Sequence, residues 1–153
     1  MPTLLFWPNV DAGSDAISKL IRTWRDRTRG LLLNVEYIRN MEPEAYQQAL
    51  ADAACCLGNS SSFVRDAGFY GTPTVIIGDR QHGREHDIHC QELLCDDALH
   101  IHHAVAFWRD NQKRFEPSTL YGDGHVSERV HAAMKRIEPY SQKHLGYSCR
   151  CSA

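Results

Sequence analysis

The chain has 153 residues, of which 42% are hydrophobic and 24% are charged, with a formal net charge of −2. This length suits one domain with its own core, and the composition excludes disordered and collagen-like chains. No overall field would attract nucleic acid or acidic lipid. The basic stretch from Lys19 to Arg29 is interpreted as a solvated helix face, with an anion or nucleic-acid contact as the alternative.

The sequence also argues against export, membrane insertion and metal binding. Its apolar runs are too short to span a membrane, and the start MPTLLFWPNV lacks the features of a signal peptide. We therefore expect a cytoplasmic protein whose cysteines are small hydrophobic residues: Cys55, Cys56, Cys90, Cys95, Cys149 and Cys151. No zinc spacing involves the histidines at 82, 86 and 89 or at 100, 102 and 103, so no metal is expected.

Short apolar runs alternate with amphipathic segments, which predicts strand–helix units and a parallel sheet. A strand is expected over 3–7, then a helix with Ser14 as its N-cap and one apolar face formed by Ala16, Ile17, Leu20, Ile21 and Trp24. A second strand is expected over 31–37. The next helix starts near Pro43, and its buried stripe consists of Tyr46, Ala49, Leu50 and Ala53.

The second half of the chain continues the alternation. The apolar run 53–57 predicts a third strand, and a short helix over 63–70 is stopped by Gly71 and Pro73. A β-branched strand over 74–77 is of the kind buried on both faces, and 87–93 is a weaker strand. Asp96 or Asp97 then caps a helix with Ala98, Ile101, Val105 and Trp108 on one face. The last predicted helix, 127–137, buries Val130, Ala133, Met134 and Ile137.

These elements predict one doubly wound α/β layer, that is, a Rossmann-like parallel sheet with helices on both faces. In such sheets, ligands bind beyond the carboxyl ends of the strands. Three predicted loops leave strands at that edge: Pro8 to Gly13, Gly58 to Ser62, and Gly78 to Arg84. The functional residues are therefore expected in these loops.

The middle loop, Gly58-Asn59-Ser60-Ser61-Ser62, leads directly into a predicted helix. Free backbone N–H groups and the helix dipole favour an anion there, and serine hydroxyls can donate to phosphate oxygens. From this loop alone, an ordinary N-cap with spare serines is the more common explanation.

The third loop changes that balance because it brings Arg80 and Arg84 to the same edge. Guanidinium groups match the geometry of phosphate and stay charged. A surface turn with incidental arginines is the alternative. Together, the serine-rich helix start and the arginine loop indicate a diphosphate site.

Several segments resemble UDP-N-acetylglucosamine 2-epimerases of the hydrolysing branch, which makes N-acetylmannosamine for sialic acid-type sugars. The resemblance rests on Gly58-Asn59-Ser60-Ser61, Arg65-Asp66, Gly71-Thr72-Pro73 and Gly78-Asp79-Arg80-Gln81-His82-Gly83-Arg84, flanked by Trp7 to Ser14 and Tyr121-Gly122-Asp123-Gly124. It covers about Leu5 to Ile137. It implies the C-terminal half of a GT-B fold, in which two Rossmann-like domains enclose the substrate.

The resemblance implies roles for individual residues. Ser60, Ser61 and Ser62 would hold the diphosphate at the helix start, with Arg80 and Arg84 near the phosphates.

The sugar and base contacts are implied in the same way. Asp66 occupies the position of a family glutamate that grips the ribose hydroxyls, and it is one methylene shorter. Asn9 would face the sugar nucleotide, while Met41 would present its backbone to uracil with Tyr46 close by.

The family reaction eliminates UDP across C1–C2 of the sugar to give a glycal, to which water adds. Proton removal needs a positioned base, and the departing diphosphate needs stabilisation. The family's acid/base carboxylates lie in the N-terminal domain, and a histidine motif opens the C-terminal one. We expect neither in this chain, nor the first strand–helix unit, and we assign no catalytic residue and no cofactor. Asp123 and His125 are polar candidates without a role.

The leading hypothesis is a single UDP-binding domain over 1–146, incomplete at its N-terminal edge, with a frayed tail over 147–153. The alternatives are a non-catalytic UDP-sugar-binding or regulatory module, and half of a GT-B glycosyltransferase. The Arg80–Arg84 run and the Tyr121–Gly124 segment argue against the latter. An exposed sheet edge and cleft face predict a homo-oligomer or a separate N-terminal catalytic chain. UDP-N-acetylglucosamine or UDP is the expected ligand.

Overall fold

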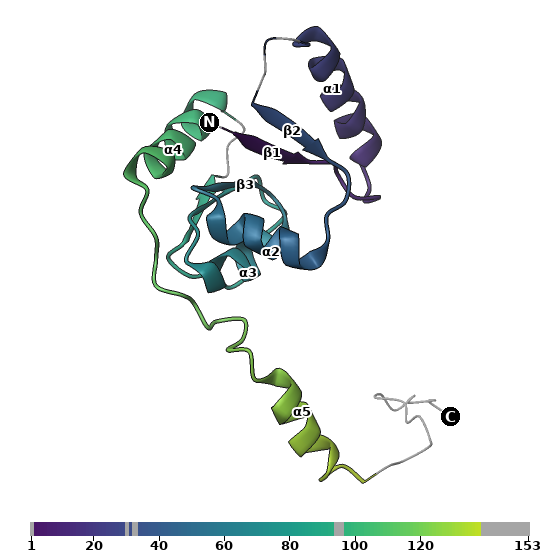
Figure 1. Ribbon diagram of the computed structural model, residues 1–153, viewed down its shortest axis with the longest axis vertical. Coiled ribbons are helices and arrows are strands. Elements are labelled where there is room, and N and C mark those ends of the chain that lie inside the picture. Colours follow the sequence, from purple (N-terminus) through teal and green to yellow (C-terminus); the bar gives the residue numbers. More distant parts are fainter. Residues whose placement is uncertain (1, 30, 32–33, 94–96, 139–153) are drawn as a thin grey trace, which may run out of the picture.

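A computed structural model describes residues 2–29, 31, 34–93 and 97–138 (Figure 1). The described elements follow in chain order: β1 (Thr3–Phe6), α1 (Ser14–Arg27), β2 (Val35–Ile38), α2 (Pro43–Asp52), β3 (Cys56–Gly58), α3 (Ser61–Arg65), the 3-10 helix η1 (Ala67–Tyr70), β4 (Thr74–Ile77), β5 (Cys90–Leu93), α4 (Ala98–Asn111) and α5 (Val126–Met134). The alternation of strands and helices confirms the predicted α/β class.

All strand pairs among the described residues are parallel, as predicted, but they form two sheets. Strand β1 pairs with β2, and a second sheet has the order β3-β4-β5. The prediction of one continuous layer therefore differs from the structure. The first sheet contacts helix α2 where the ring of Phe6 in β1 meets the ring of Tyr46 edge-on, with centroids 5.3 Å apart.

Two predicted boundaries in the first sheet shift. Gly13, not Ser14, is the N-cap of α1, because the chain enters the helix through a left-handed φ of 85° that glycine adopts without strain. Ser14 is the first helical residue instead. Strand β2 begins at Val35, the residue paired with Thr3, whereas Leu31 lies in a turn with its N–H bonded to Thr28.

Two further boundaries shift near Gly58–Ser62, called the serine segment below. The third strand is Cys56–Gly58, because Ala53 ends α2 as its C-cap. The predicted helix over 63–70 is two helices: α3 starts earlier, at Ser61, and the chain tightens into η1 after Asp66. Gly71 ends η1 in the left-handed conformation, as the sequence indicated. Asp97 is the cap of α4, its carboxylate accepting from the N–H of Leu99.

The core lies around β4, which is bonded on both sides and contacted by α3 and α4. Val75 and Ile76 are fully buried, and Leu50 of α2 and Val64 of α3 are also buried. The expectation of a β4 strand buried on both faces is thus confirmed. Cys55, Cys56 and Cys90 are free thiols and are buried or half-buried, as expected of small hydrophobic residues.

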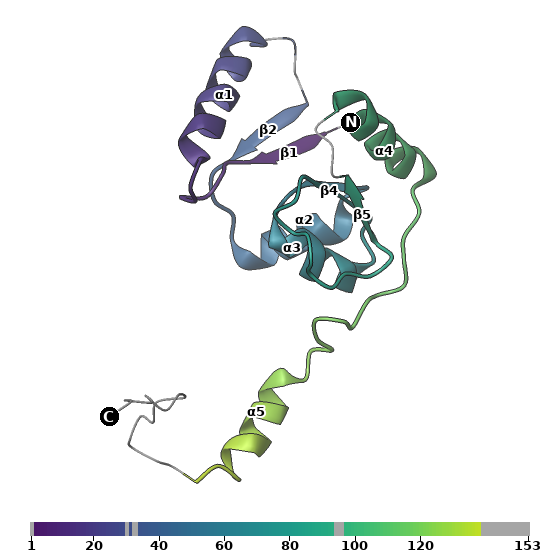
Figure 2. The same cartoon turned by 180° about the vertical axis from the view of Figure 1, so that it is seen from behind.

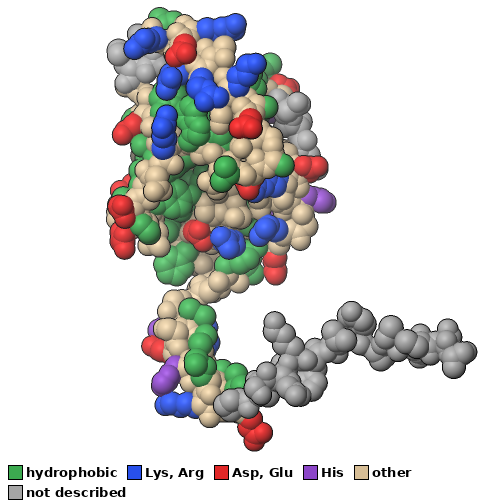
Figure 3. Space-filling view, turned by 90° about the vertical axis from the view of Figure 1, so that its right-hand side faces the viewer, with side chains coloured by type: hydrophobic (Ala, Val, Ile, Leu, Met, Phe, Trp, Pro, Cys, Tyr) green, Lys and Arg blue, Asp and Glu red, His purple; other side chains and the backbone are tan. Residues whose placement is uncertain are grey.

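The last helix departs from the prediction. Figures 1 and 2 show α5 standing away from both sheets, and Figure 3 shows its hydrophobic side chains at the surface. Val130, Met134 and Ile137 expose 50%, 68% and 64% of their surface, and Ala133 is exposed too. The predicted burial of this stripe is wrong, because no described element lies against it. The domain boundary at 146 and the tail over 147–153 lie outside the described residues.

Gly71 tests how tightly the segment after η1 is packed. A methyl group there would lie 2.0 Å from the Phe115 carbonyl oxygen, on a backbone with φ of +65°. We expect Gly71→Ala to destabilise the chain well beyond the roughly 1–2 kcal/mol of left-handed strain. Gly83→Ala is the matched control, because Gly83 has φ of +78° and nothing within 4 Å of the added methyl. Equal losses in urea unfolding would contradict this packing.

The buried thiols predict a loss of stability in alkali. Burial raises the pKa of Cys56 from 9.0 to about 12, and those of Cys55 and Cys90 to about 11. The unfolded chain releases these protons first, so their contribution is complete below pH 9 and is lost as pH rises toward 11–12. Cys56→Ala should reduce the slope of unfolding free energy above pH 9 by at most about 1.4 kcal/mol per pH unit. An unchanged slope in urea titrations between these pH values would argue against a buried Cys56 thiol.

Candidate functional site

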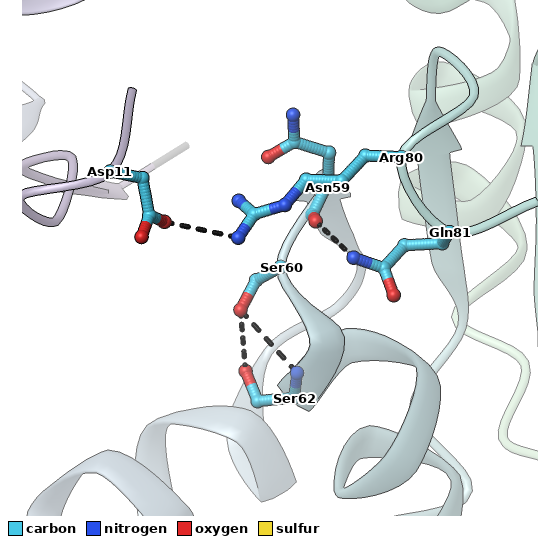
Figure 4. A network of polar contacts seen from close by, with 6 residues as sticks. All are labelled: Asp11, Asn59, Ser60, Ser62, Arg80 and Gln81. Carbon is cyan, nitrogen blue, oxygen red and sulfur yellow. Dashed lines mark hydrogen bonds and ion pairs between the residues drawn. The ribbon is translucent and has the colours of Figure 1, made fainter. Parts of the chain in front are cut away.

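Three loops meet at the carboxyl ends of the strands, as predicted from the sequence. The Arg80 guanidinium in the β4–β5 loop lies 3.0 Å from the Asp11 carboxylate in the β1–α1 loop (Figure 4). In the same β4–β5 loop, Gln81 donates from Nε2 to the carbonyl of Asn59 at 2.8 Å. The loop therefore links the first sheet to the serine segment.

The serine segment forms the start of α3. Ser60 is the N-cap, and its Oγ accepts from the N–H of Ser62 at 3.4 Å. Capping, the plainer of the two explanations for this segment, is thus confirmed for Ser60. Ser61 is the first helical residue, and its hydroxyl has no hydrogen bond among the described residues. This leaves the Ser61 hydroxyl available to a ligand.

Ser62 is held from the side by α2. Its Oγ lies 2.5 Å from the Tyr46 hydroxyl and 3.0 Å from Ser60 Oγ, so three hydroxyls form one chain. Burial is the main cause of the raised pKa of Tyr46, and the negative charge of Asp66 adds to it. Tyr46 therefore stays protonated at neutral pH and keeps a hydroxyl proton for this chain.

The two arginines of the β4–β5 loop are in different situations. Arg80 is about half-exposed and is ion-paired to Asp11. The Arg84 side chain is exposed and has no ion pair within the described ranges. An exposed pair of this kind is worth less than about 1 kcal/mol, so the Arg80 guanidinium can exchange Asp11 for another anion at small cost.

The remaining predicted residues are less engaged. Asp66 is exposed where α3 meets η1, one turn after the serines. Asn9 is exposed in the β1–α1 loop, and Met41 is half-buried just before α2. The structure thus brings the serines, Tyr46 and the Gln81 loop into direct contact, while Asn9 and Met41 make no side-chain hydrogen bond among the described residues.

Sequence reasoning gave no role to Asp11 or Gln81, although both stood in segments that it singled out. Asp11 lies in the Trp7–Ser14 segment, and Gln81 lies between the two arginines of the third loop. Gln81 is only 2% exposed, which is unusual for an amide side chain in a loop. The available signal was the position of Asp11 and Gln81 within these two segments, since neither residue type is diagnostic by itself.

The Tyr121–Gly124 segment contacts the loop that carries Arg80 and Arg84 through a hydrogen bond. The Tyr121 hydroxyl donates to the carbonyl of Glu85, next to Arg84. Asp123 accepts from both Nη atoms of Arg129 and from the N–H of His125, and these bonds lower the pKa of Asp123 to about 2. Asp123 is therefore charged at neutral pH, which suits it poorly to accept a proton.

The fold and the site define a class of protein. Parallel strands alternate with helices, and the candidate binding loops meet at the carboxyl edge, so the chain is a Rossmann-like α/β domain. Within the described ranges, no helix is long and apolar enough to cross a membrane, and no three potential metal ligands gather.

A family model described as UDP-N-acetylglucosamine 2-epimerase matches residues 1–135. The chain belongs to this family. It is similar to a UDP-N,N'-diacetylbacillosamine 2-epimerase (hydrolyzing) of Legionella pneumophila, with 29% identity over 136 residues. That alignment covers 88% of this chain and 34% of the relative, so the chain spans about a third of the relative's length.

The Tyr46–Ser62 contact predicts a measurable stability difference. Tyr46→Phe removes one partner of the half-buried Ser62 hydroxyl, and we expect a loss of about 1 kcal/mol in urea unfolding. Tyr70→Phe is the matched control, because Tyr70 is also half-buried but its hydroxyl has no hydrogen bond in the described part of the chain. Equal values for the two variants would show that the hydroxyl chain does not stabilise α3.

Proposed function

We propose that this chain is the nucleotide-binding, C-terminal half of a hydrolysing UDP-N-acetylglucosamine 2-epimerase. The observation that carries the proposal is the convergence of the serine-capped start of α3 with the Arg80 loop at one sheet edge. Membership of the epimerase family supports the choice of nucleotide sugar.

In this proposal the serines and arginines hold the diphosphate. Ser61 has a free hydroxyl at the first position of α3, and Ser60 retains a hydroxyl proton when its oxygen caps the helix. When the Ser62 oxygen accepts from the Tyr46 hydroxyl, Ser62 can donate its own proton to a phosphate oxygen. Arg80 exchanges Asp11 for a phosphate oxygen, and the exposed Arg84 adds a second positive charge.

The nucleoside contacts follow from the same placement. Asp66 directly follows α3, at the opposite end of the helix from the Ser60 cap. A carboxylate at this position suits the vicinal hydroxyls of ribose. Met41 precedes α2, and Tyr46 of α2 contacts Ser62. We therefore assign the Met41 backbone to the base. Asn9 in the β1–α1 loop faces the sugar side, next to the Asp11 that meets Arg80.

The proposed chemistry needs a group that stabilises the leaving UDP. Elimination breaks the C1–O bond and removes the proton from C2, so that the diphosphate oxygen takes the bonding electron pair. Hydrogen-bond donors and guanidinium groups preorganised around the diphosphate lower the barrier to this step. The carboxylates that move protons are assigned to the N-terminal domain of the family, either on a separate chain or on a further part of this protein.

The exposed apolar face of α5 supports self-association or binding to such a partner. A non-catalytic UDP-sugar-binding module keeps the same site without turnover. Half of a GT-B glycosyltransferase is disfavoured by the epimerase match.

Calorimetric titration with UDP tests the proposal, with CMP and GMP as controls. We expect UDP-selective binding that Ser61→Ala and Arg80→Ala each weaken about tenfold, since each removes a hydrogen bond to a charged phosphate. Arg136→Ala, an exposed arginine beyond α5, is the matched control and should bind like the wild type. Equal affinity for all three nucleotides, or loss with Arg136→Ala, would overturn the assignment of the site.

A further inference from the structure

The backbone carbonyls just before and just after the serines, those of Asn59 and Phe63, accept from buried side chains of β4 and of the β4–β5 connection. Before the serines, the carbonyl of Asn59 accepts from Gln81 Nε2 at 2.8 Å (Figure 4). Gln81 is 2% exposed, and it is among the largest fully buried side chains. This bond fixes the backbone directly ahead of Ser60.

After the serines, the carbonyl of Phe63 accepts from His89 Nε2 at 3.3 Å and from Thr74 Oγ1 at 3.3 Å. Helix α3 ends at Arg65, and the Asp66 N–H donates to the Ser62 carbonyl at 2.7 Å in its last turn. The Phe63 carbonyl is one of those that a helix end leaves without a backbone donor. Side chains of β4 and the residue before β5 supply the missing donors.

The His89 ring is buried and packs directly against Gly68. It is 3% exposed, and a methyl group on Gly68 of η1 would lie 2.5 Å from its Cε1. Burial lowers the pKa of His89, so the ring is neutral at neutral pH, with the proton on Nε2 when it donates to Phe63.

Gln81 and His89 each have one buried polar atom whose presence a purely stabilising role does not explain. Among the described residues, Gln81 Oε1 and His89 Nδ1 are buried without a hydrogen-bond partner. Burying an unpaired polar atom is unfavourable, so an apolar residue of similar size would suit a purely structural role better. Polar side chains at both positions therefore point to the bonds that they do make.

We infer that Gln81 and His89 are positioning residues that set the orientation of Ser60, Ser61 and Ser62 toward a diphosphate. The inference rests on the proposed function. Three donors aimed at one anion need placement to a fraction of an ångström, and α3 is too short to hold its own direction. The carbonyls on each side of the serines, held by buried side chains of the β4–β5 connection, supply that placement.

Gln81→Met and His89→Leu test this inference, with affinities for UDP and for uridine measured by ligand-observed NMR competition. Uridine lacks the diphosphate, so a displaced serine segment should weaken UDP about tenfold and leave uridine within about twofold. His89→Gln restores an amide donor and should recover UDP affinity to within about threefold of the wild type. Val75→Ala is the control for lost stability alone, and it should not change the ratio of the two affinities.

The outcomes separate the inference from the proposed function. A wild-type chain without UDP selectivity would overturn the proposed function itself. Selective wild-type binding with an unchanged UDP-to-uridine ratio in Gln81→Met would overturn the inference, as would equal losses for both ligands. If His89→Leu does not fold, Thr74→Val removes another side-chain donor to the Phe63 carbonyl at nearly constant volume, and the same ratio decides.

Discussion

Backbone hydrogen bonds along both edges of β4 are the constraint on which the rest of the structure depends. Strand β4 pairs with β3 on one side and β5 on the other, in parallel and in register. Parallel pairing places the carboxyl ends of β3 and β4 at the same edge. The serine segment and the arginine loop therefore meet, although 22 positions separate Asn59 from Gln81.

The hydrogen bonds behind α3 are strong, whereas the ion pair between the site and the first sheet is weak. Behind α3, Gln81, His89 and Thr74 bond to backbone carbonyls from buried positions, where hydrogen bonds are least exposed to water. Toward the first sheet, the exposed Arg80–Asp11 pair is screened by solvent. The second sheet thus carries the more rigid part of the proposed binding surface, and the first sheet contributes the Asp11 carboxylate, which the proposed ligand would displace.

The apolar faces of α1 and α5 show what a periodic sequence pattern predicts about burial and what it does not. The spacing of Ile17, Leu20 and Trp24 in α1 and of Val130 and Met134 in α5 gives one apolar side to each helix, as predicted. The five side chains expose 49%, 69%, 42%, 50% and 68% of their surface in the described chain. A pattern identifies the side that favours burial, but burial itself requires a neighbouring surface.

The sequence alone determined the parallel α/β class, most of the helices and strands, the three loops at the carboxyl edge of the strands and the epimerase resemblance. These follow from local rules: hydrophobic period, β-branched runs, glycine and proline at element ends, and motif order. Tertiary structure alone decided that Tyr46 holds Ser62, and that Gln81 and His89 are buried behind the serines. Each of these contacts joins residues far apart in the chain, whose proximity depends on strand pairing and helix packing. No local pattern encodes which distant group a buried side chain will meet.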